Sequence, residues 1–258
     1  MLKISNIRLE VGEELCNDVI CRNTPISSKD IDFFKLVKKS VDARKKNDIH
    51  YNCSVLVKVK NEDKYLKFKN VSKYQKYQLT IPKIKSDLRP IIVGCGPAGL
   101  FAALYLSYSG LKPLLIERGS DVDKRIRAVE NFWKNGVFDA KTNVQFGEGG
   151  AGTFSDGKLT TGVNDERMEF VKEQLVKFGA PEDILYLAKP HVGTDKLSVT
   201  VKNIRNEIIR LGGEVLFETQ LTDIDIENGK ISAVEVLKND KKESYKCDVL
   251  LLAIGHSA

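Results

Sequence analysis

The chain has 258 residues, of which 42% are hydrophobic and 29% charged, so it can bury one large core or two smaller ones, as globular proteins do. It contains no apolar run of the roughly 18 to 20 residues that a membrane span needs and no apolar signal segment at its N-terminus. Its five cysteines form no CxxC pair and have no histidine at zinc-ligand spacing. These features predict a cytoplasmic protein with reduced thiols, no membrane partner and no metal site.

The net charge of +6 is unevenly distributed along the chain. Residues 1–89 hold 20 Lys and Arg against 11 Asp and Glu, whereas residues 90–258 hold 21 against 24. A basic front part and a mildly acidic back part predict two domains with different surfaces. We place these domains at residues 1–80 and 90–258, joined by a polar linker at residues 81–89 that contains a proline.

The front part predicts a small α+β domain. Residues 2–11 and 49–60 alternate apolar and polar side chains, the pattern of half-buried strands. Between them we expect one helix at residues 13–20 and a second at residues 27–46. The apolar face of the second helix would be formed by Ile31, Phe34, Leu36, Val37 and Val41.

The back part opens with a buried strand at residues 89–96, a helix at residues 97–110 and a second buried strand at residues 112–119. This βαβ order predicts a parallel sheet with both faces covered. Three more helices are expected at residues 121–136, 165–179 and 196–213, with a glycine-rich loop at residues 146–161 after the first of them. Residues 214–239 predict a strand meander, and residues 247–255 predict a last buried strand.

The stretch "GCGPAG" carries the strongest motif in the chain. Gly94, Gly96 and Gly99 stand in the G-x-G-x-x-G spacing between the first strand and the helix that begins with Pro97 and Ala98. The first glycine allows a tight turn, the second lets the backbone approach a pyrophosphate, and the third permits close packing of helix and strand. The positive end of the helix then faces the phosphates. The motif predicts a dinucleotide site.

The identity of the dinucleotide depends on Glu117, which ends the second strand 18 residues after Gly99. A carboxylate at this position accepts hydrogen bonds from ribose hydroxyls, which fits FAD or NAD and counts against NADP. A plain NAD domain continues through alternating strands and helices, whereas here a glycine-rich loop interrupts the order. The interruption favours FAD.

Five segments together resemble the poorly characterised bacterial FAD-dependent dehydrogenases, often labelled NAD(FAD)-utilising dehydrogenases. These segments are residues 38–59, 117–136, 143–161, 189–197 and 250–258. The resemblance implies a ferredoxin-like N-terminal domain followed by a FAD-binding Rossmann-like domain of the two-dinucleotide-binding type, with an inserted substrate subdomain. It also implies that chains of the family continue beyond "GHSA", so we expect a truncated chain whose flavin domain lacks its closing segment.

The same resemblance implies positions for the cofactor. The strand that ends at Ala253 and Gly255 would pass beside the pyrophosphate and ribose, and Gln220 and Leu221 would lie near the adenine. The loop from residue 149 to 158 would lie beside the pyrophosphate or the flavin ring. Its glycines fit either a flexible turn or a close approach to a ligand, and its remaining candidates are Gly150, Gly152, Thr153, Ser155, Asp156 and Lys158.

Several charged or titratable residues fit more than one role. Arg118 and Arg125 would contact phosphates or belong to a solvated helix face. Lys158 would stabilise an anionic reduced flavin, and His191 would donate a proton or be structural. His256 would approach the flavin. Only His191 and Lys158 are catalytic candidates, and both are weak.

The leading functional hypothesis is a FAD-dependent oxidoreductase of unknown substrate, with NAD(P)H as a possible electron donor or acceptor. A competing hypothesis is a nucleic-acid-binding or regulatory module with a vestigial flavin site, because lysines interleave with Tyr65, Tyr74 and Tyr77 in the basic front part. The front part lacks an RNA-recognition signature, so we do not expect a nucleic-acid partner. A third hypothesis is an inactive fragment of the full-length flavoprotein.

Overall fold

The computed structural model describes residues 1–154, 157–159, 161–163 and 165–255, and its contacts divide the chain into two units. The first unit comprises Met1–Leu79, Lys158–Glu173 and Pro181–His191. The second comprises Thr80–Gly157, Gln174–Ala180 and Val192–Ala258. Residues 81–89, the predicted linker, have no regular secondary structure.

The first unit contains a four-stranded antiparallel sheet in the order β2-β3-β1-β4. Its elements are β1 (Leu2–Glu10), α1 (Asn17–Asn23), the 3-10 turn η1 (Ser28–Asp30), β2 (Ile31–Asp42), β3 (His50–Val59) and β4 (Val71–Lys73). A ferredoxin-like domain follows the order strand, helix, two strands, helix, strand. The first unit has this order except that residues 61–70 form turns in place of the second helix.

The helix expected at residues 27–46 is wrong, because the segment forms the long strand β2. The strand pairs with β3 from Ile31 to Asp42, and its register shifts twice, between Ile31 and Phe33 and between Leu36 and Lys38. Each shift inserts an extra residue and restarts the alternation of inward and outward side chains. Apolar residues therefore recur at a spacing that imitates a helix.

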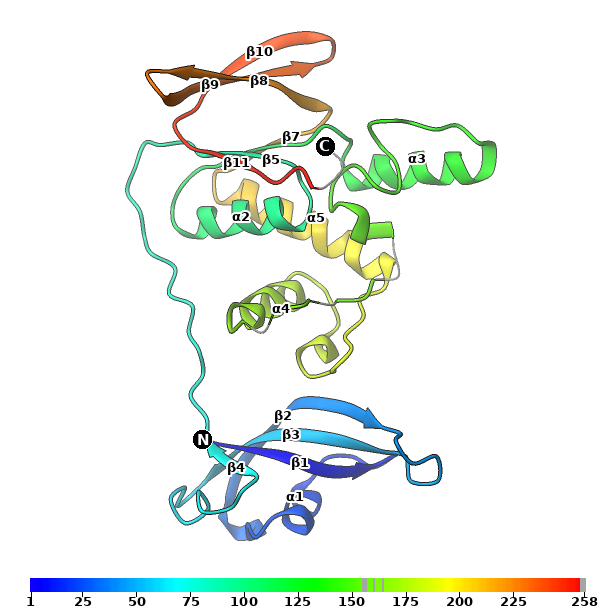
Figure 1. The fold of residues 1–258 in the computed structure, drawn as a ribbon, viewed down its shortest axis with the longest axis vertical. Coiled ribbons are helices and arrows are strands. Elements are labelled where there is room, and N and C mark those ends of the chain that lie inside the picture. The colour runs from blue at the N-terminus through cyan, green and yellow to red at the C-terminus, as the bar shows by residue number, and fades with distance from the viewer. Residues whose placement is uncertain (155–156, 160, 164, 256–258) are drawn as a thin grey trace. The chain divides into compact units, whose positions relative to one another are not determined.

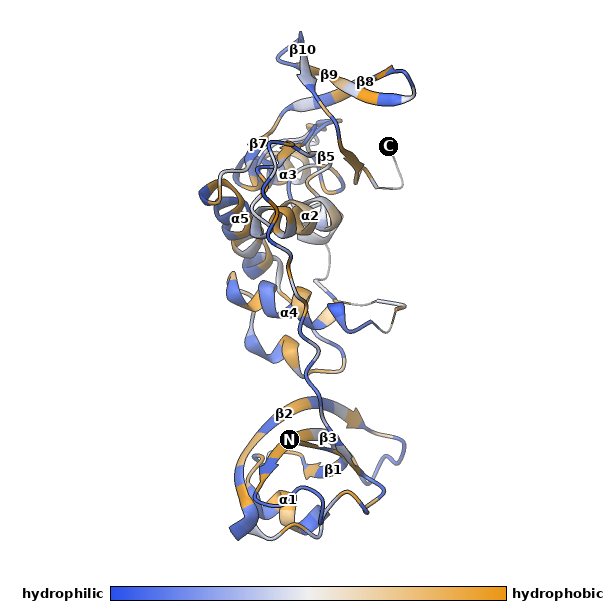
Figure 2. Cartoon of the chain, turned by 90° about the vertical axis from the view of Figure 1, so that its left-hand side faces the viewer, coloured by the Kyte–Doolittle hydropathy of each residue, from blue (hydrophilic) through white to orange (hydrophobic). Residues whose placement is uncertain are grey.

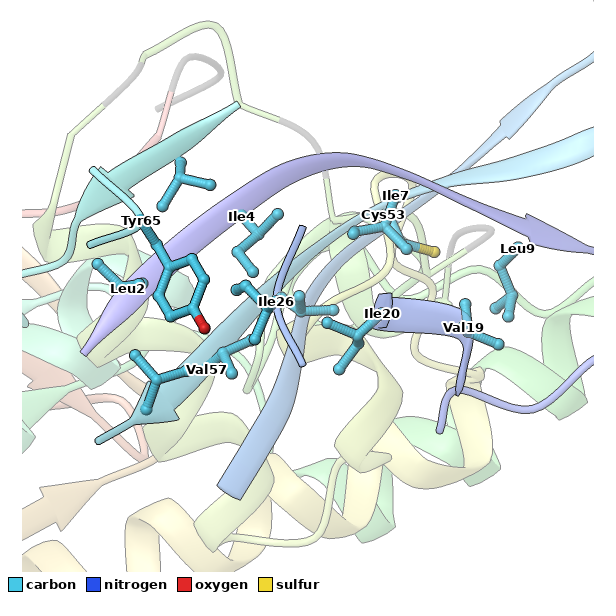
Figure 3. Close-up of a cluster of buried hydrophobic side chains, with 13 residues drawn as sticks. Leu2, Ile4, Ile7, Leu9, Val19, Ile20, Ile26, Cys53, Val57 and Tyr65 are labelled. Atoms are coloured by element: carbon cyan, nitrogen blue, oxygen red, sulfur yellow. The ribbon is translucent and has the colours of Figure 1, made fainter. Parts of the chain in front are cut away.

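The core of the first unit lies between the sheet and α1, as Figure 3 shows. Val19 and Ile20 of α1 pack against strand residues such as Ile4 and Ile7, all of them almost fully buried. Tyr65 closes the cluster from the turn segment, with 1% of its surface exposed and its hydroxyl donating to Asp30. The first unit therefore has a hydrophobic core of its own.

The second unit is built on a parallel sheet in the order β11-β5-β6-β7. The strands are β5 (Ile91–Val93), β6 (Leu114–Ile116), β7 (Glu214–Leu216) and β11 (Leu250–Leu252). Numbered along the chain, their spatial order is 3-2-1-4, the first part of the doubly wound dinucleotide-binding order. The predicted Rossmann-like parallel sheet is confirmed.

Helices cover one face of this sheet, and Figure 1 shows α2 and α5 side by side beneath it. The helices of the back part are α2 (Pro97–Tyr108), α3 (Val122–Asn135), α4 (Arg167–Lys177) and α5 (Thr194–Arg210), with the 3-10 turns η2 (Ala151–Phe154) and η3 (Glu182–Leu185). Helix α2 carries no charged side chain and is drawn in pale and orange shades in Figure 2. Its apolar character fits a helix packed between the sheet and α5.

A second sheet covers part of the other face. The predicted burial of the last strand is wrong, because Leu251 and Leu252 of β11 are 42% and 52% exposed. Strands β8 (Thr219–Glu227), β9 (Lys230–Lys238) and β10 (Lys241–Lys246) form an antiparallel sheet in the order β10-β9-β8. Val234 and Val236 of β9 are buried in one cluster with Ile91 and Ile116 of the parallel sheet. The predicted meander is therefore corrected in one respect: residues 214–216 belong to the parallel sheet as β7 and not to the meander.

Candidate dinucleotide-binding site

The carboxyl ends of β5 and β11 meet where the strand order of the parallel sheet reverses, the place where doubly wound folds bind ligands. The Ala253 N–H donates to the Val93 carbonyl at 2.7 Å, which ties the end of β11 to the end of β5. Gly94 follows with a φ of +102°, and a Cβ added there would overlap the Ala253 carbonyl oxygen. The end of β11 therefore lies against the glycine motif, while the predicted position of Ala253 beside the pyrophosphate and ribose stays a prediction.

The N-terminus of α2 opens at this point. Gly96 is the N-cap and Pro97 the first helical residue, no side chain caps the helix, and its first turn holds no acidic residue. A Cβ on Gly99 would overlap the Gly94 carbonyl oxygen, so the helix packs directly on the turn before it. Pro97 and Ala98 are exposed. Unsatisfied N–H groups and the positive end of the helix therefore face outward, as an anion site requires.

Gly96 has a different reason to be glycine. A Cβ built on it meets no heavy atom within 4 Å, and its φ of −75° is one that any residue adopts. Neither its φ nor a neighbouring atom excludes a Cβ at this position. The open space beside Gly96 is what a bound pyrophosphate needs, so the residues present fit a dinucleotide.

Glu117 lies buried at the end of β6 and holds the glycine motif in place. Its carboxylate accepts the Cys95 N–H at 2.7 Å and the Gly119 N–H at 2.8 Å. With 7% of its surface exposed, it ties the turn after β5 to the turn after β6. The ribose contact predicted for Glu117 stays a prediction, since each carboxylate oxygen retains a second acceptor site.

The second glycine-rich segment packs directly on the first. The Gly149 N–H donates to the Cys95 carbonyl at 2.8 Å. A Cβ on Gly150 would lie 3.3 Å from the Gly96 Cα and 3.2 Å from the Pro97 Cδ. Residues far apart in the sequence thus form two walls of one cradle. Gly152 has open space around its Cβ position.

Arg125 of α3 lies under this second wall and is fully buried. Its guanidinium donates to five backbone carbonyls and lies 4.7 Å from the centre of the Phe154 ring. Burial lowers its pKa to about 10, so it stays a cation at neutral pH. The five acceptors are the carbonyls of Asn143, Val144, Gly147, Glu148 and Gly150. The predicted solvated helix face is wrong for Arg125, and its phosphate contact stays a prediction.

Glu148 is a buried acid that the sequence analysis missed. Its Oε2 accepts the Val122 N–H at 2.7 Å and pairs with Arg205 at 3.2 Å, while its Oε1 is buried without a partner among the described residues. Burial raises the pKa of this carboxyl, and Arg205 offsets part of the effect. The only signal in the sequence was a single acid among the glycines of "GEGG".

The comparisons with known proteins decide the family. Residues 88–258, more than half of the chain, match the family model described as pyridine nucleotide-disulphide oxidoreductase. The chain belongs to the pyridine nucleotide-disulphide oxidoreductase family. Residues 1–58 match a second model, described as a domain of unknown function, DUF8436. The expected kinship with FAD-dependent oxidoreductases is thereby confirmed at the level of this family.

Relatives of this oxidoreductase-family chain are longer than it is. An uncharacterized protein of Clostridium beijerinckii is 47% identical over 267 residues, which cover all of this chain and 49% of the relative. Digeranylgeranylglycerophospholipid reductase 2 of Methanococcoides burtonii is 24% identical over 172 residues, which cover 67% of this chain and 39% of the reductase. A solved structure of THI4 from Thermovibrio ammonificans is 16% identical, with a TM-score of 0.42, covering 66% of this chain and 58% of that one. The chain spans about half the length, or less, of the curated relatives it matches.

In this oxidoreductase-family domain, the family match supports FAD as the cofactor, and the open space at Gly96 fits a dinucleotide. NAD(P)H as a second dinucleotide stays a prediction. The start of β8 lies beside Glu117, because the Thr219 N–H donates to the Glu117 carbonyl at 2.9 Å. Gln220 and Leu221 follow and are half-buried, and Leu221 packs against the core. Their expected contact with adenine is not tested.

Arg118, Thr153 and Gly255, the remaining candidates, take no part in the hydrogen bonds described above. Arg118 is half-buried, with its guanidinium 4.5 Å from the centre of the Phe146 ring. Thr153 is 1% exposed, and its hydroxyl has no partner among the described residues. Gly255 has a φ of +78° and open space at its Cβ position. Their predicted contacts with the cofactor remain predictions.

Lys158 and His191, the two weak catalytic candidates, pair with each other in an antiparallel bridge. The Leu159 N–H donates to the Pro190 carbonyl at 3.0 Å beside this bridge. Both candidates belong to the first unit, whereas the cradle belongs to the second, so their approach to a flavin stays a prediction. Residues 155, 156 and 256, the other loop and histidine candidates, lie outside the described residues.

Among the described residues, no helix is long and apolar enough to cross a membrane. The same residues contain no group of three or more His, Cys, Asp or Glu side chains placed to hold a metal ion. Cys95 lies beside the cradle but is completely buried, and burial together with Glu148 and Glu117 raises the pKa of its thiol. A thiol with a raised pKa is a poor nucleophile, so Cys95 fits a packing role.

Proposed function

We propose that the chain is the dinucleotide-binding part of a FAD-dependent oxidoreductase. The observation that carries the proposal is the open space at the Cβ position of Gly96, beside the uncapped N-terminus of α2. When bound, FAD supplies two-electron transfer, which no side chain of the protein performs by itself. The residues of this chain contribute binding, orientation and the local electrostatic field.

Each part of the cradle has a proposed task. The first N–H groups of α2 bind the pyrophosphate, because they have no intrahelical partners and lie at the positive end of the helix dipole. Gly96 leaves room for the phosphate, and Gly150 packs against Gly96 and Pro97 to form the adjoining wall. Glu117 accepts a ribose hydroxyl with a remaining acceptor site while its two backbone bonds hold it in position. This arrangement supports FAD over NADP, whose 2′-phosphate would meet a carboxylate.

The substrate and the electron partner of the whole protein are not assigned. The chain matches 49% of the Clostridium beijerinckii relative, and the reaction of the complete protein is a proposal at the level of two-electron flavin chemistry. NAD(P)H remains the proposed second dinucleotide. The cytoplasmic location also stays a prediction.

The nucleic-acid-binding hypothesis gains little support. Of the three tyrosines that suggested it, Tyr65 is buried in the core of the first unit, so its ring is not available to stack on a base. Tyr77 has 37% of its surface exposed. Base stacking by single-strand binding proteins requires exposed aromatic rings in a basic groove. A FAD-dependent oxidoreductase therefore remains the better-supported function.

The direct test is Gly96→Val. Because a Cβ at Gly96 meets no protein atom, the substitution should cost the fold only about 1 kcal/mol, the usual penalty of Val in place of Gly at an N-cap, while filling the pyrophosphate space. FAD titration, followed by the absorbance and fluorescence of the flavin, should show saturable binding by the wild type. The variant should bind at least about 100-fold more weakly, which corresponds to roughly 2.7 kcal/mol.

Gly162→Val is the matched control, since Gly162 also has open space at its Cβ position and lies in the first unit. It should bind FAD as the wild type does. A wild-type protein that gains no flavin bands on addition of FAD would contradict the proposed function. Equal FAD affinity of the wild type and Gly96→Val would contradict the proposed position of the pyrophosphate.

A further inference from the structure

Arg125 is a fully buried cation with no role in the account above, and its environment is unusual. An arginine of a helix most often keeps its charged end in water. Here the guanidinium lies beneath the second glycine-rich segment, where its Nε and both terminal nitrogens donate to backbone carbonyls. A single side chain thus fixes the direction of peptide groups from residue 143 to residue 150.

The bond to Gly150 matters most for the cradle. Arg125 Nη1 donates to the Gly150 carbonyl at 2.8 Å, and Gly150 packs closely against Gly96 and Pro97. In a trans peptide the carbonyl and the following N–H point in opposite directions. The carbonyl of the Gly150–Ala151 peptide points toward buried Arg125, so the Ala151 N–H points away from it.

The Ala151 N–H is a free donor. Ala151 is exposed and begins η2, and its N–H has no acceptor among the residues that the structure describes. The neighbouring N–H groups are engaged, since Glu148 donates to the Ser120 carbonyl and Gly149 to the Cys95 carbonyl. A free N–H beside a glycine that approaches Gly96 is suited to an oxygen of a phosphate.

We propose that Arg125 is a positioning residue, which holds the Gly150–Ala151 peptide so that its N–H donates to a pyrophosphate oxygen of the bound dinucleotide. The proposal rests on the proposed function, because it deepens the description of the same site. Arg125 acts through the backbone and does not touch the phosphate. The Ala151 N–H would thereby add a hydrogen-bond donor to those at the N-terminus of α2.

Arginine is suited to this task and lysine is not. The planar guanidinium presents five N–H groups in a fixed fork, which reaches carbonyls in several directions, whereas an ammonium group has three donors at one point. The Phe154 ring supports the face of the guanidinium at 4.7 Å. Arg125→Lys should therefore keep a buried cation but lose several of the bonds that orient the loop.

The first measurement uses the protein without FAD. In Arg125→Lys, amide hydrogen exchange at Glu148 and Gly149 should become faster, since their bonds depend on the loop geometry. Exchange in β5 and β6 should stay as in the wild type. Arg127→Lys is the matched control, because Arg127 is exposed on the same helix. It should leave all of these exchange rates unchanged.

The second measurement is FAD affinity. Arg125→Lys should bind FAD about 10- to 100-fold more weakly, the size of effect found when a residue that orients a ligand-binding group is replaced. In Arg125→Ala, guanidinium ion at a low, non-denaturing concentration should restore part of the affinity. Guanidinium should have no such effect on the control variant.

The outcomes separate the two proposals. Failure of the wild type to bind FAD overturns the proposed function, whatever the variants do. Saturable binding by the wild type together with unchanged affinity in Arg125→Lys overturns the positioning role. Faster exchange at Glu148 and Gly149 with unchanged affinity also overturns it, since Arg125 would then stabilise the loop without serving the ligand.

Discussion

The two glycine-rich turns of the cradle are held in place by different means. The turn from Gly94 to Gly99 is shaped by backbone contacts, because a Cβ at either end would overlap a carbonyl oxygen. The turn from Gly147 to Gly150 is shaped by the side chain of Arg125, which comes from a helix more than 20 residues earlier. The first turn is held by backbone packing, which includes the distant Ala253, and by the Glu117 carboxylate, whereas the second is held by hydrogen bonds from the Arg125 guanidinium.

The difference shows where each turn is vulnerable. In the first turn the damage comes from adding atoms, since Gly94 and Gly99 have no room for a side chain. The second turn has no room at Gly147 either, since a Cβ there would lie 2.7 Å from the Arg125 Cδ. It also depends on the Arg125 side chain, because without the guanidinium five carbonyls would lose one shared donor. Substitutions of opposite kinds therefore test the comparison.

The largest loss of stability is expected from Arg125→Met. Buried carbonyls left without donors cost about 1 to 3 kcal/mol each before relaxation and water entry, and breaking a buried charged network typically costs about 3 to 5 kcal/mol in total. We expect the free energy of unfolding to fall by about 4 kcal/mol in urea denaturation. Arg127→Met, the exposed control, should change it by less than about 0.5 kcal/mol. A loss below about 1 kcal/mol for Arg125→Met would show that the turn does not need the guanidinium.

A smaller loss is expected from Gly99→Ala. The added Cβ would overlap the Gly94 carbonyl oxygen, and overpacking of this kind costs about 1 to 3 kcal/mol. We expect about 2 to 3 kcal/mol by chemical denaturation, together with weaker FAD binding. Gly136→Ala gives the contrast, since Gly136 has a φ of +72° but no neighbour at its Cβ position and should lose only about 1 kcal/mol. Equal losses of stability in Gly99→Ala and Gly136→Ala would mean that the overlap with the Gly94 carbonyl oxygen adds nothing to the cost.

Glu117→Gln should have a more modest effect. The amide keeps one acceptor oxygen but turns an NH2 group toward the N–H of Cys95 or Gly119. We expect a loss of about 1 to 2 kcal/mol in thermal or chemical unfolding. Glu130→Gln, at an exposed ion pair with Lys134 on α3, should change stability by less than about 0.5 kcal/mol. No difference between the two variants would argue against the buried bonds of Glu117.

The smallest effect is expected as a dependence on pH. Burial raises the pKa of Glu148 above its ordinary value of 4.5, so the folded protein holds this proton more tightly than the unfolded chain does. The stability that this tighter proton binding gives to the fold is fully present below the pKa of Glu148 in the unfolded chain. It is lost as the pH rises through the pKa of Glu148 in the folded protein. Glu148→Gln should therefore gain stability relative to the wild type as the pH rises above about 4.5. Parallel stability curves for the two proteins would contradict the raised pKa.

The sequence predicted those parts of the site that local spacing specifies. Gly94, Gly96, Gly99 and Glu117 could be placed because a strand, a turn, a helix and a second strand follow one another without interruption. The network of Arg125 could not, because nothing in the local sequence shows that a charged helix residue is buried under a loop that follows it. Glu148 was missed for the same reason.

The front part gives the complementary lesson about the fold. Strand β2 was predicted as a helix because two register shifts break the alternation of its apolar residues. The partner strand β3, into which none of the register shifts inserts a residue, was predicted correctly from its alternation. Long-range pairing decided the structure of the segment where the local pattern was ambiguous.

The central claim is that the two turns form one cradle for one dinucleotide. A titration of the isotope-labelled protein with FAD, followed by amide NMR signals, tests it most directly. The account predicts that the signals of Gly96 and Gly99 in the first turn and of Gly150 and Ala151 in the second change together, with one common saturation point. FAD binding that changes the signals of only one turn would contradict the claim.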